Sequence, residues 1–111
     1  MNTEWRPIPG APGYEVSVLG WVRSWRRRRG EPRMLAATPD REGYPRIDAR
    51  VDGRTLPMAV HRKVLEAFVG PAPKGLFALH RNRKRTDNRL SNLYWGTRSD
   101  SHIGTTRRVR K

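Results

Sequence analysis

The sequence contains no cysteine, and hydrophobic residues make up only 35% of its 111 positions. The lack of cysteine excludes disulfide bridges, thiolate zinc sites and cysteine nucleophiles, so any metal must be held by nitrogen or oxygen ligands. No apolar run reaches the roughly 18 residues that a membrane span needs, and no apolar signal-peptide core follows Met1. We therefore expect a cytoplasmic protein with no membrane partner.

Acidic residues are also scarce, because 10 Asp and Glu stand against 24 Lys and Arg for a formal charge of +14. Arginine supplies 20 of these cations, and its planar guanidinium suits bidentate contacts with phosphate and guanine. Residues 1–53 carry 10 basic and 7 acidic side chains, whereas residues 54–111 carry 14 and 3. This charge favours nucleic acid as the partner and indicates no small-molecule substrate.

Short alternating stretches in the first half are typical of β-hairpins. Three early prolines exclude a helix, and the pattern then predicts two strands joined at Leu19-Gly20, over residues 14–18 and 21–25. A second hairpin is predicted over residues 43–51 and 54–60, because Asp52-Gly53 is a strong two-residue turn signal. Pro45 and Pro57 indicate that its strands lie at sheet edges.

The second half predicts two helices and two strands. An apolar stripe with 3.6-residue spacing predicts a helix over residues 61–69, ended by Gly70 and Pro71. A short strand over residues 76–79 is then expected to end at His80, and a return strand over residues 90–95. Between them lies a basic segment with no periodicity, which predicts a solvated loop. A capping box at residues 97–100 predicts a short helix that starts near Ser99.

Two further groups of residues bear on binding. Four consecutive like charges repel one another unless a polyanion lies beside them, so we expect phosphate contacts from the run Arg26, Arg27, Arg28 and Arg29, with a solvated loop as the alternative. The four tryptophans are expected mainly in the core because aliphatic residues are few, although stacking on bases is the alternative.

The segment from Leu79 to Ser101 resembles the HNH endonuclease family, in its phage and intron branch with a ββα-metal (His-Me) finger. The resemblance rests on His80, followed eight and twelve residues later by Asn88 and Asn92, with leucine directly after the second asparagine. Residues 60–68 extend it, and residues 5–24 resemble the small DNA-binding module that often precedes such nucleases. It implies an α+β fold of short β-hairpins, with residues 1–33 as DNA-binding module and residues 34–111 as nuclease core.

The resemblance also implies an activity, namely hydrolysis of double-stranded DNA with a divalent metal, Mg²⁺ or alternatively Mn²⁺. His80 would be the general base and Asn92 would support the loop, with Asn88 shaping the same loop. The basic side chains that would grip the DNA backbone beside His80 are Arg81, Arg83, Lys84, Arg85 and Arg89. Homing-type or phage-associated cleavage is implied, which would place a phage-encoded enzyme in the host cytoplasm. His61 is expected to be structural, because it lies on the apolar stripe of its helix.

The metal-ligand positions depart from the family pattern. Related enzymes usually have a ligand just before the base and another nine residues after the motif asparagine, and here these positions are Leu79 and Ser101. Leucine cannot ligate and a serine hydroxyl is a weak ligand, while His102 would need a shifted register to substitute. Two interpretations stay open: a weakly held metal, or a catalytically weak or inactive DNA-binding protein. An RNA-binding protein of the translation machinery is a third, and the chain could be a monomer or a homodimer.

Overall fold

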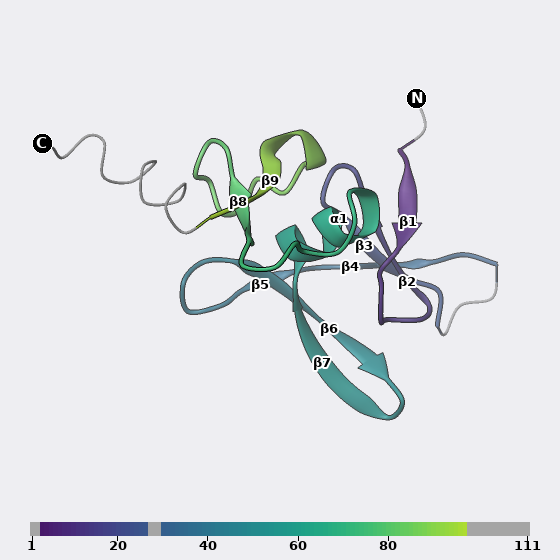
Figure 1. The fold of residues 1–111 in the computed structure, drawn as a ribbon. Coiled ribbons are helices and arrows are strands. Elements are labelled where there is room, and N and C mark those ends of the chain that lie inside the picture. The colour runs from purple at the N-terminus through teal and green to yellow at the C-terminus, as the bar shows by residue number, and fades with distance from the viewer. Residues whose placement is uncertain (1–2, 27–29, 98–111) are drawn as a thin grey trace, which may run out of the picture.

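The computed structural model describes residues 3–26 and 30–97, and the chain forms three antiparallel sheets and one α-helix over this part (Figure 1). The first sheet has the order β1-β2-β3-β4, with strands Trp5–Pro7, Tyr14–Ser17, Val22–Ser24 and Arg33–Leu35. The predicted hairpin is confirmed, since Val16 pairs with Val22 across β2 and β3. The fourth strand was not predicted.

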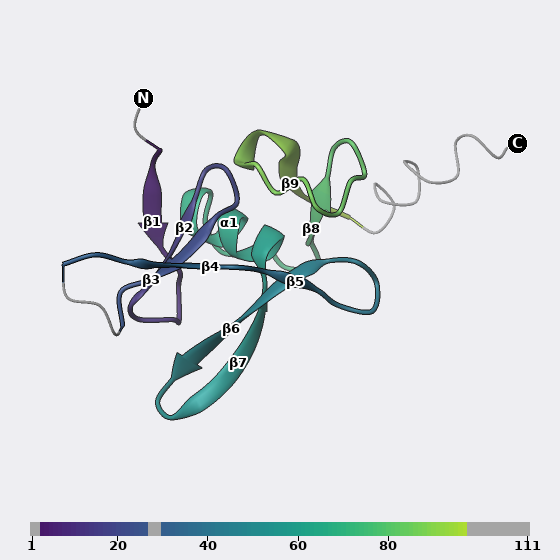
Figure 2. The same cartoon turned by 180° about the vertical axis from the view of Figure 1, so that it is seen from behind.

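The second sheet has the order β5-β6-β7, with strands Thr38–Pro39, Pro45–Val51 and Arg54–Ala59. The predicted turn is confirmed, because Asp52 and Gly53 both have positive φ angles, as the favoured two-residue hairpin turn requires. This hairpin projects away from the rest of the chain in both views (Figures 1 and 2). Pro57 lies on an edge strand as predicted, but the edge prediction for Pro45 was wrong: it begins the central strand, where it pairs with Pro39.

The remaining elements are α1 (Val60–Phe68), β8 (Phe77–His80), a 3₁₀ turn η1 (Leu90–Asn92) and β9 (Leu93–Gly96). Strands β8 and β9 form the third sheet, in which His80 pairs with Leu93. The helix and both strands are confirmed, except that the return strand begins at Leu93. The helix expected from Ser99 lies outside the described residues. Antiparallel strands with one helix give the expected α+β class, and no helix of the described part is long and apolar enough to cross a membrane.

The core lies where α1 packs against the strands. Val60, Val64 and Leu65 of the helix are buried together with Val16 and Val22 of the first sheet. The hydroxyl of Tyr14 accepts a hydrogen bond of 2.7 Å from the backbone N–H of Arg50, which ties the first sheet to the second. A single apolar cluster therefore joins the elements that carry the N-terminal and C-terminal motifs.

Trp95 packs against this core as expected, but the expectation was wrong for Trp21 and Trp25. Trp21 is 51% exposed and Trp25 38% exposed, while Trp5 and Trp95 are half-buried. Aliphatic side chains from α1 and the strands make up most of the core instead, and Arg23 covers the indole faces of Trp5 and Trp25. The guanidinium of Arg23 lies 4.0 Å from the ring centre of Trp5 and 5.2 Å from that of Trp25.

Candidate functional site

His80 lies at the end of β8 with its ring held by a single side-chain partner. Its Nε2 atom is 2.7 Å from Oδ1 of Asn88, and the two residues are only 9% and 6% exposed. An amide oxygen can only accept, so this contact places the ring proton on Nε2 and leaves Nδ1 as the acceptor nitrogen. Burial lowers the pKa of His80, partly opposed by the hydrogen bond to Asn88. The side chain is therefore a neutral imidazole near neutral pH.

Two further rings stack beside His80. The ring centre of His61, from the first turn of α1, lies 5.0 Å from that of His80 and 5.0 Å from that of Tyr44, which directly precedes β6. Burial lowers the pKa of His61 to about 4, and the neighbouring His80 contributes. The Nδ1 atom of His61 is buried and has no hydrogen-bond partner within residues 3–26 and 30–97. Tyr44 was missed at the level of sequence.

Asn92 holds the loop that follows His80. Its amide nitrogen donates to Oδ1 of Asn82 and to the backbone carbonyl of Asp87, both at 2.9 Å. Its amide oxygen accepts from the backbone N–H of Asn82 at 3.1 Å. Because both ends of the loop are fastened to one buried side chain, the path from His80 to Asn88 is fixed. Asn82 was also missed, although an asparagine that can bond nearby backbone is a recognised turn former.

The segment between β8 and η1 is a loop with exposed basic side chains, as predicted, and several of these side chains also have partners within the protein. Arg89 makes two 2.8 Å hydrogen bonds to the carboxylate of Asp87, and this pairing lowers the pKa of Asp87 well below its usual range. The guanidinium of Arg81 lies over Tyr94. That of Arg85 lies over Tyr44 and also donates to the backbone carbonyl of Glu42.

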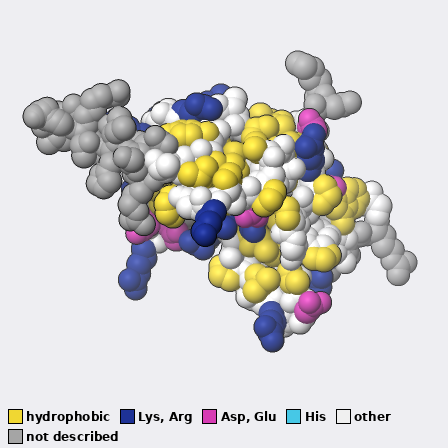
Figure 3. Space-filling view, viewed as in Figure 1, with side chains coloured by type: hydrophobic (Ala, Val, Ile, Leu, Met, Phe, Trp, Pro, Cys, Tyr) yellow, Lys and Arg dark blue, Asp and Glu magenta, His cyan; other side chains and the backbone are white. Residues whose placement is uncertain are grey.

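Other predicted DNA contacts are distributed elsewhere. Arg83 and Lys84 are exposed at the tip of the loop, and Arg26 is exposed after β3. Arg27, Arg28 and Arg29 lie outside the described residues. On the face shown in Figure 3, the lysine and arginine side chains stand at separate places with hydrophobic side chains exposed between them.

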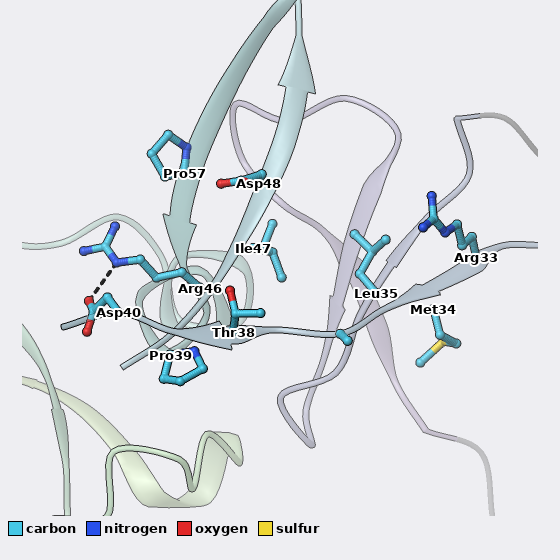
Figure 4. A pocket seen from close by; sticks show the side chains of 11 residues that line it. Arg33, Met34, Leu35, Thr38, Pro39, Asp40, Arg46, Ile47, Asp48 and Pro57 are labelled. Atoms are coloured by element: carbon cyan, nitrogen blue, oxygen red, sulfur yellow. Dashed lines mark hydrogen bonds and ion pairs between the residues drawn. The ribbon is translucent and has the colours of Figure 1, made fainter. Parts of the chain in front are cut away.

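The surface around the second sheet has two cavities, and one of them reaches the rings beside His80. One of about 630 Å³ is lined by Tyr44 and His61 together with Leu79. The other, of about 580 Å³, lies between β4 and the second sheet, and the ion pair of Arg46 with Asp40 stands at one side of it (Figure 4). Neither of these two cavities is lined by His80 or Asn88.

Two family models match different parts of the chain. Residues 58–102 match the family model of the HNH endonucleases, and residues 4–50 match that of the NUMOD4 motif. The chain thus has one segment similar to a NUMOD4 motif and a second similar to an HNH endonuclease, referred to below as the NUMOD4 motif and the HNH segment. The HNH segment holds α1, β8, β9 and the three residues of the expected motif, His80, Asn88 and Asn92. The predicted resemblance is confirmed.

A solved structure supports the same assignment over almost the whole chain. The structure of DNA binding and cleavage by the HNH homing endonuclease I-HmuI superposes with a TM-score of 0.83 at 28% sequence identity. The match covers 95% of this chain but 59% of that one, so the present chain spans only part of the length of that nuclease. No curated protein matches this sequence.

The described part of the HNH segment, residues 58–97, supplies an incomplete set of metal ligands. Over residues 3–26 and 30–97, no group of three or more His, Asp or Glu side chains could hold an ion. Leu79, half-buried and paired with Tyr94, has no donor atom, and the carboxylate of Asp87 is already engaged by Arg89. Ser101 and His102 lie outside the described residues. The described donors therefore do not by themselves fit a metal ion.

Proposed function

We propose that the chain is a DNA endonuclease that hydrolyses phosphodiester bonds with His80 as the general base. The observation that carries the proposal is the buried Nε2 contact of His80 with Asn88, which leaves Nδ1 unprotonated at the end of β8. A neutral imidazole nitrogen can accept a proton from a water molecule at neutral pH, as a general base must. Homing-type action, as in I-HmuI, and a phage origin belong to the same proposal.

The reaction assigned to His80 is a single proton transfer coupled to displacement at phosphorus. Nδ1 accepts a proton from water while the water oxygen bonds to phosphorus, and the bond from phosphorus to the leaving sugar oxygen breaks. A divalent ion such as Mg²⁺ or Mn²⁺, when bound, supplies charge neutralisation at the phosphate and stabilises the leaving oxygen. Asn92 keeps the loop in place during this step. We also propose Ser101 and His102 as candidate ligands of that ion.

DNA would be held by two basic regions with different roles. The loop arginines and Lys84 would grip the backbone beside the scissile phosphate, because phosphate contacts fix position without reading sequence. Residues 1–33, with the run Arg26 to Arg29, would serve as the binding module and residues 34–111 as the nuclease core. Whether the chain nicks as a monomer or cuts both strands as a homodimer is part of the test.

The decisive experiment is incubation of supercoiled plasmid with the full chain and Mg²⁺ or Mn²⁺. We expect metal-dependent conversion to nicked or linear DNA, and no conversion by His80→Ala. The variant should bind a DNA duplex as tightly as the parent, because His80 is buried. The absence of nicking by the parent, or equal nicking by the variant, would refute the enzymatic proposal.

A second candidate function is DNA binding without cleavage, and Leu79 favours it. A side chain with no donor atom occupies the position where related enzymes place a ligand. This candidate predicts salt-sensitive DNA binding, as the nuclease does, but no product in any metal. A competition between duplex DNA and structured RNA, run on the same samples, would reveal an RNA-binding protein instead.

A further inference from the structure

The turn between β2 and β3 of the NUMOD4 motif lies directly against the residue that holds His80. Gly20 in this turn has a φ angle of 88°, and a Cβ built on it would lie 2.8 Å from the carbonyl oxygen of Asn88 and 2.9 Å from its Cβ. Side-chain carbons essentially never approach other atoms so closely. Only glycine satisfies both the backbone conformation and the approach, so the turn and Asn88 are in contact through backbone.

Backbone hydrogen bonds of Val18, two residues before Gly20, reinforce this contact. The N–H of Leu90 donates to the carbonyl of Val18 at 2.8 Å, and the N–H of Val18 donates to the carbonyl of Glu4 at 3.1 Å. The turn itself is rigid, because the fully buried Ser17 accepts hydrogen bonds on its Oγ from two backbone N–H groups of the turn. Asn88 and Leu90, two residues further on, are thus both held by the N-terminal motif.

We propose that the β2–β3 turn of the NUMOD4 motif positions the catalytic base, through the contact of Gly20 with Asn88 and the hydrogen bond from Leu90 to the carbonyl of Val18. The 2.7 Å contact between Asn88 and Nε2 of His80 selects the ring tautomer, so the position of Asn88 decides which nitrogen is free. A shift of Asn88 by about 1 Å would break that contact, and misplacements of this size cost up to about a hundredfold in rate. The NUMOD4 motif is then part of the catalytic scaffold in addition to any DNA contacts, and the inference rests on the proposed role of His80.

The first test compares Gly20→Ala with Gly53→Ala. Gly53 has a similar φ of 77° but no atom within 4 Å of a built Cβ, so this control carries the same backbone strain without the contact. The ¹⁵N NMR spectrum of the imidazoles in the DNA-free protein reports the tautomer of His80, assigned with His80→Ala. We expect Gly20→Ala to convert a large fraction of His80 to the other tautomer and Gly53→Ala to leave it unchanged. An unchanged tautomer in Gly20→Ala, or an equal change in both variants, would overturn the inference.

Activity provides a readout that separates positioning from binding. We expect Gly20→Ala to lower kcat for plasmid nicking about tenfold or more with KM within about twofold, since the chemistry and not DNA binding is disturbed. The double variant Gly20→Ala/Asn88→Ala should lose no more than Asn88→Ala alone, because both act on one contact. Independent, multiplying losses would contradict an action through Asn88.

A second pair of variants guards against misfolding of Gly20→Ala. Leu90→Pro removes the N–H that bonds to Val18 at the first position of η1, where proline is tolerated, and Arg89 before it already has the extended conformation that proline requires. Leu90→Ala removes the side chain but keeps the N–H. The inference expects a His80 tautomer change in Leu90→Pro only, and equal spectra for the two would refute it.

The outcomes also separate this inference from the proposed function. The tautomer spectrum needs no cleavage, so a parent chain that never nicks DNA removes the enzymatic proposal while the positioning of His80 is still measured. If His80→Ala abolishes nicking but Gly20→Ala leaves both spectrum and kcat unchanged, the nuclease assignment stands and the NUMOD4 role fails.

Discussion

The imidazole rings of His61 and His80 lie with their centres 5.0 Å apart, and the surroundings of the two rings differ. Nε2 of His80 contacts Asn88, whereas Nδ1 of His61 has no partner in the part of the chain that the structure describes. Burial lowers the pKa of both rings below the ordinary value for histidine, and the neighbouring His80 lowers that of His61 further. The pair is therefore arranged to stay neutral, which is the state in which His80 can accept a proton.

This arrangement predicts that the folded chain loses stability in mild acid. His61 has a pKa of about 4 in the fold and an ordinary value near 6.5 when unfolded, so the unfolded chain binds the extra proton between these pH values. Stability is full above about pH 6.5 and falls as the pH drops toward 4, by about 3 kcal/mol from this residue. Urea unfolding at pH 7.5 and pH 4.5 measures it. His61→Phe keeps a flat ring and cannot titrate, so it should show a smaller loss; an equal loss would contradict the prediction.

A second prediction concerns the pH dependence of plasmid nicking. Neutral His80 is the active form, so the rate should rise with pH through the pKa of this group and then level off. Burial places that pKa below the ordinary value near 6.5, with Asn88 and Asp87 acting to raise it and Arg85 to lower it. We expect the acid limb of the single-turnover rate to have its midpoint below pH 6.5. Asn88→Ala removes the contact that favours the protonated ring, so its midpoint should lie lower still.

The secondary structure of this chain was accessible from sequence wherever side-chain periodicity reflects burial. Tyr14 and Val16 alternate with polar residues and are buried on β2, and Val64 and Leu65 lie on the apolar stripe of α1. Strand β4 was not accessible, because Arg33 and Met34 are exposed and backbone pairing with β3 alone defines the strand. Periodicity carries no signal for such an element.

The residues of the candidate site also divide into those that the sequence predicted and those that it did not. His80, Asn88 and Asn92 follow a spacing along the chain, and their resemblance to a known motif identified them. Tyr44 reaches the His80 ring only through the packing of the second sheet against α1, so no local pattern indicates it. The turn at Gly20 was predicted, but its contact with Asn88 joins residues far apart in sequence, and only the folded chain brings them together.

Asn92→Ala should destabilise the loop more than most single substitutions. It removes three hydrogen bonds that fasten Asn82 and Asp87, and each buried bond contributes about 1 kcal/mol, so a loss of about 2–3 kcal/mol is expected. Thermal or urea unfolding measures it, with nicking assayed well below the new midpoint. Ser91→Ala, at an exposed neighbouring position, is the control and should change stability by under about 0.5 kcal/mol.

Lys84→Ala should weaken DNA binding without altering sequence preference. Lys84 is exposed in the loop beside His80, where a phosphate contact releases one counterion. If about six phosphates are neutralised, the slope of log affinity against log salt is near −5, and losing one contact reduces its magnitude by about 1. Fluorescence anisotropy with a labelled duplex over a salt series measures the slope. Lys74→Ala removes the same charge from the exposed segment before β8 and should leave the slope unchanged; equal slopes for both variants would place the DNA elsewhere.

Leu79→Asp tests whether the missing donor limits catalysis. The position directly precedes His80 on β8 and is half-buried beside the cavity that His61 lines, so a carboxylate there adds an oxygen ligand next to the base. We expect the rate of plasmid nicking in Mn²⁺ or Mg²⁺ to rise about tenfold or more, and the metal concentration for half-maximal rate to fall. A free carboxylate partly removed from water is unfavourable, so the variant should also be less stable without metal and regain stability when metal is added.

Leu79→Asn introduces an oxygen without charge and should give a smaller rise in the nicking rate, whereas Leu79→Ala should give none. If Leu79→Asp binds DNA normally but neither its rate nor its stability responds to metal, the ion is not bound at this position, and the nuclease interpretation then depends on ligands near residues 101 and 102.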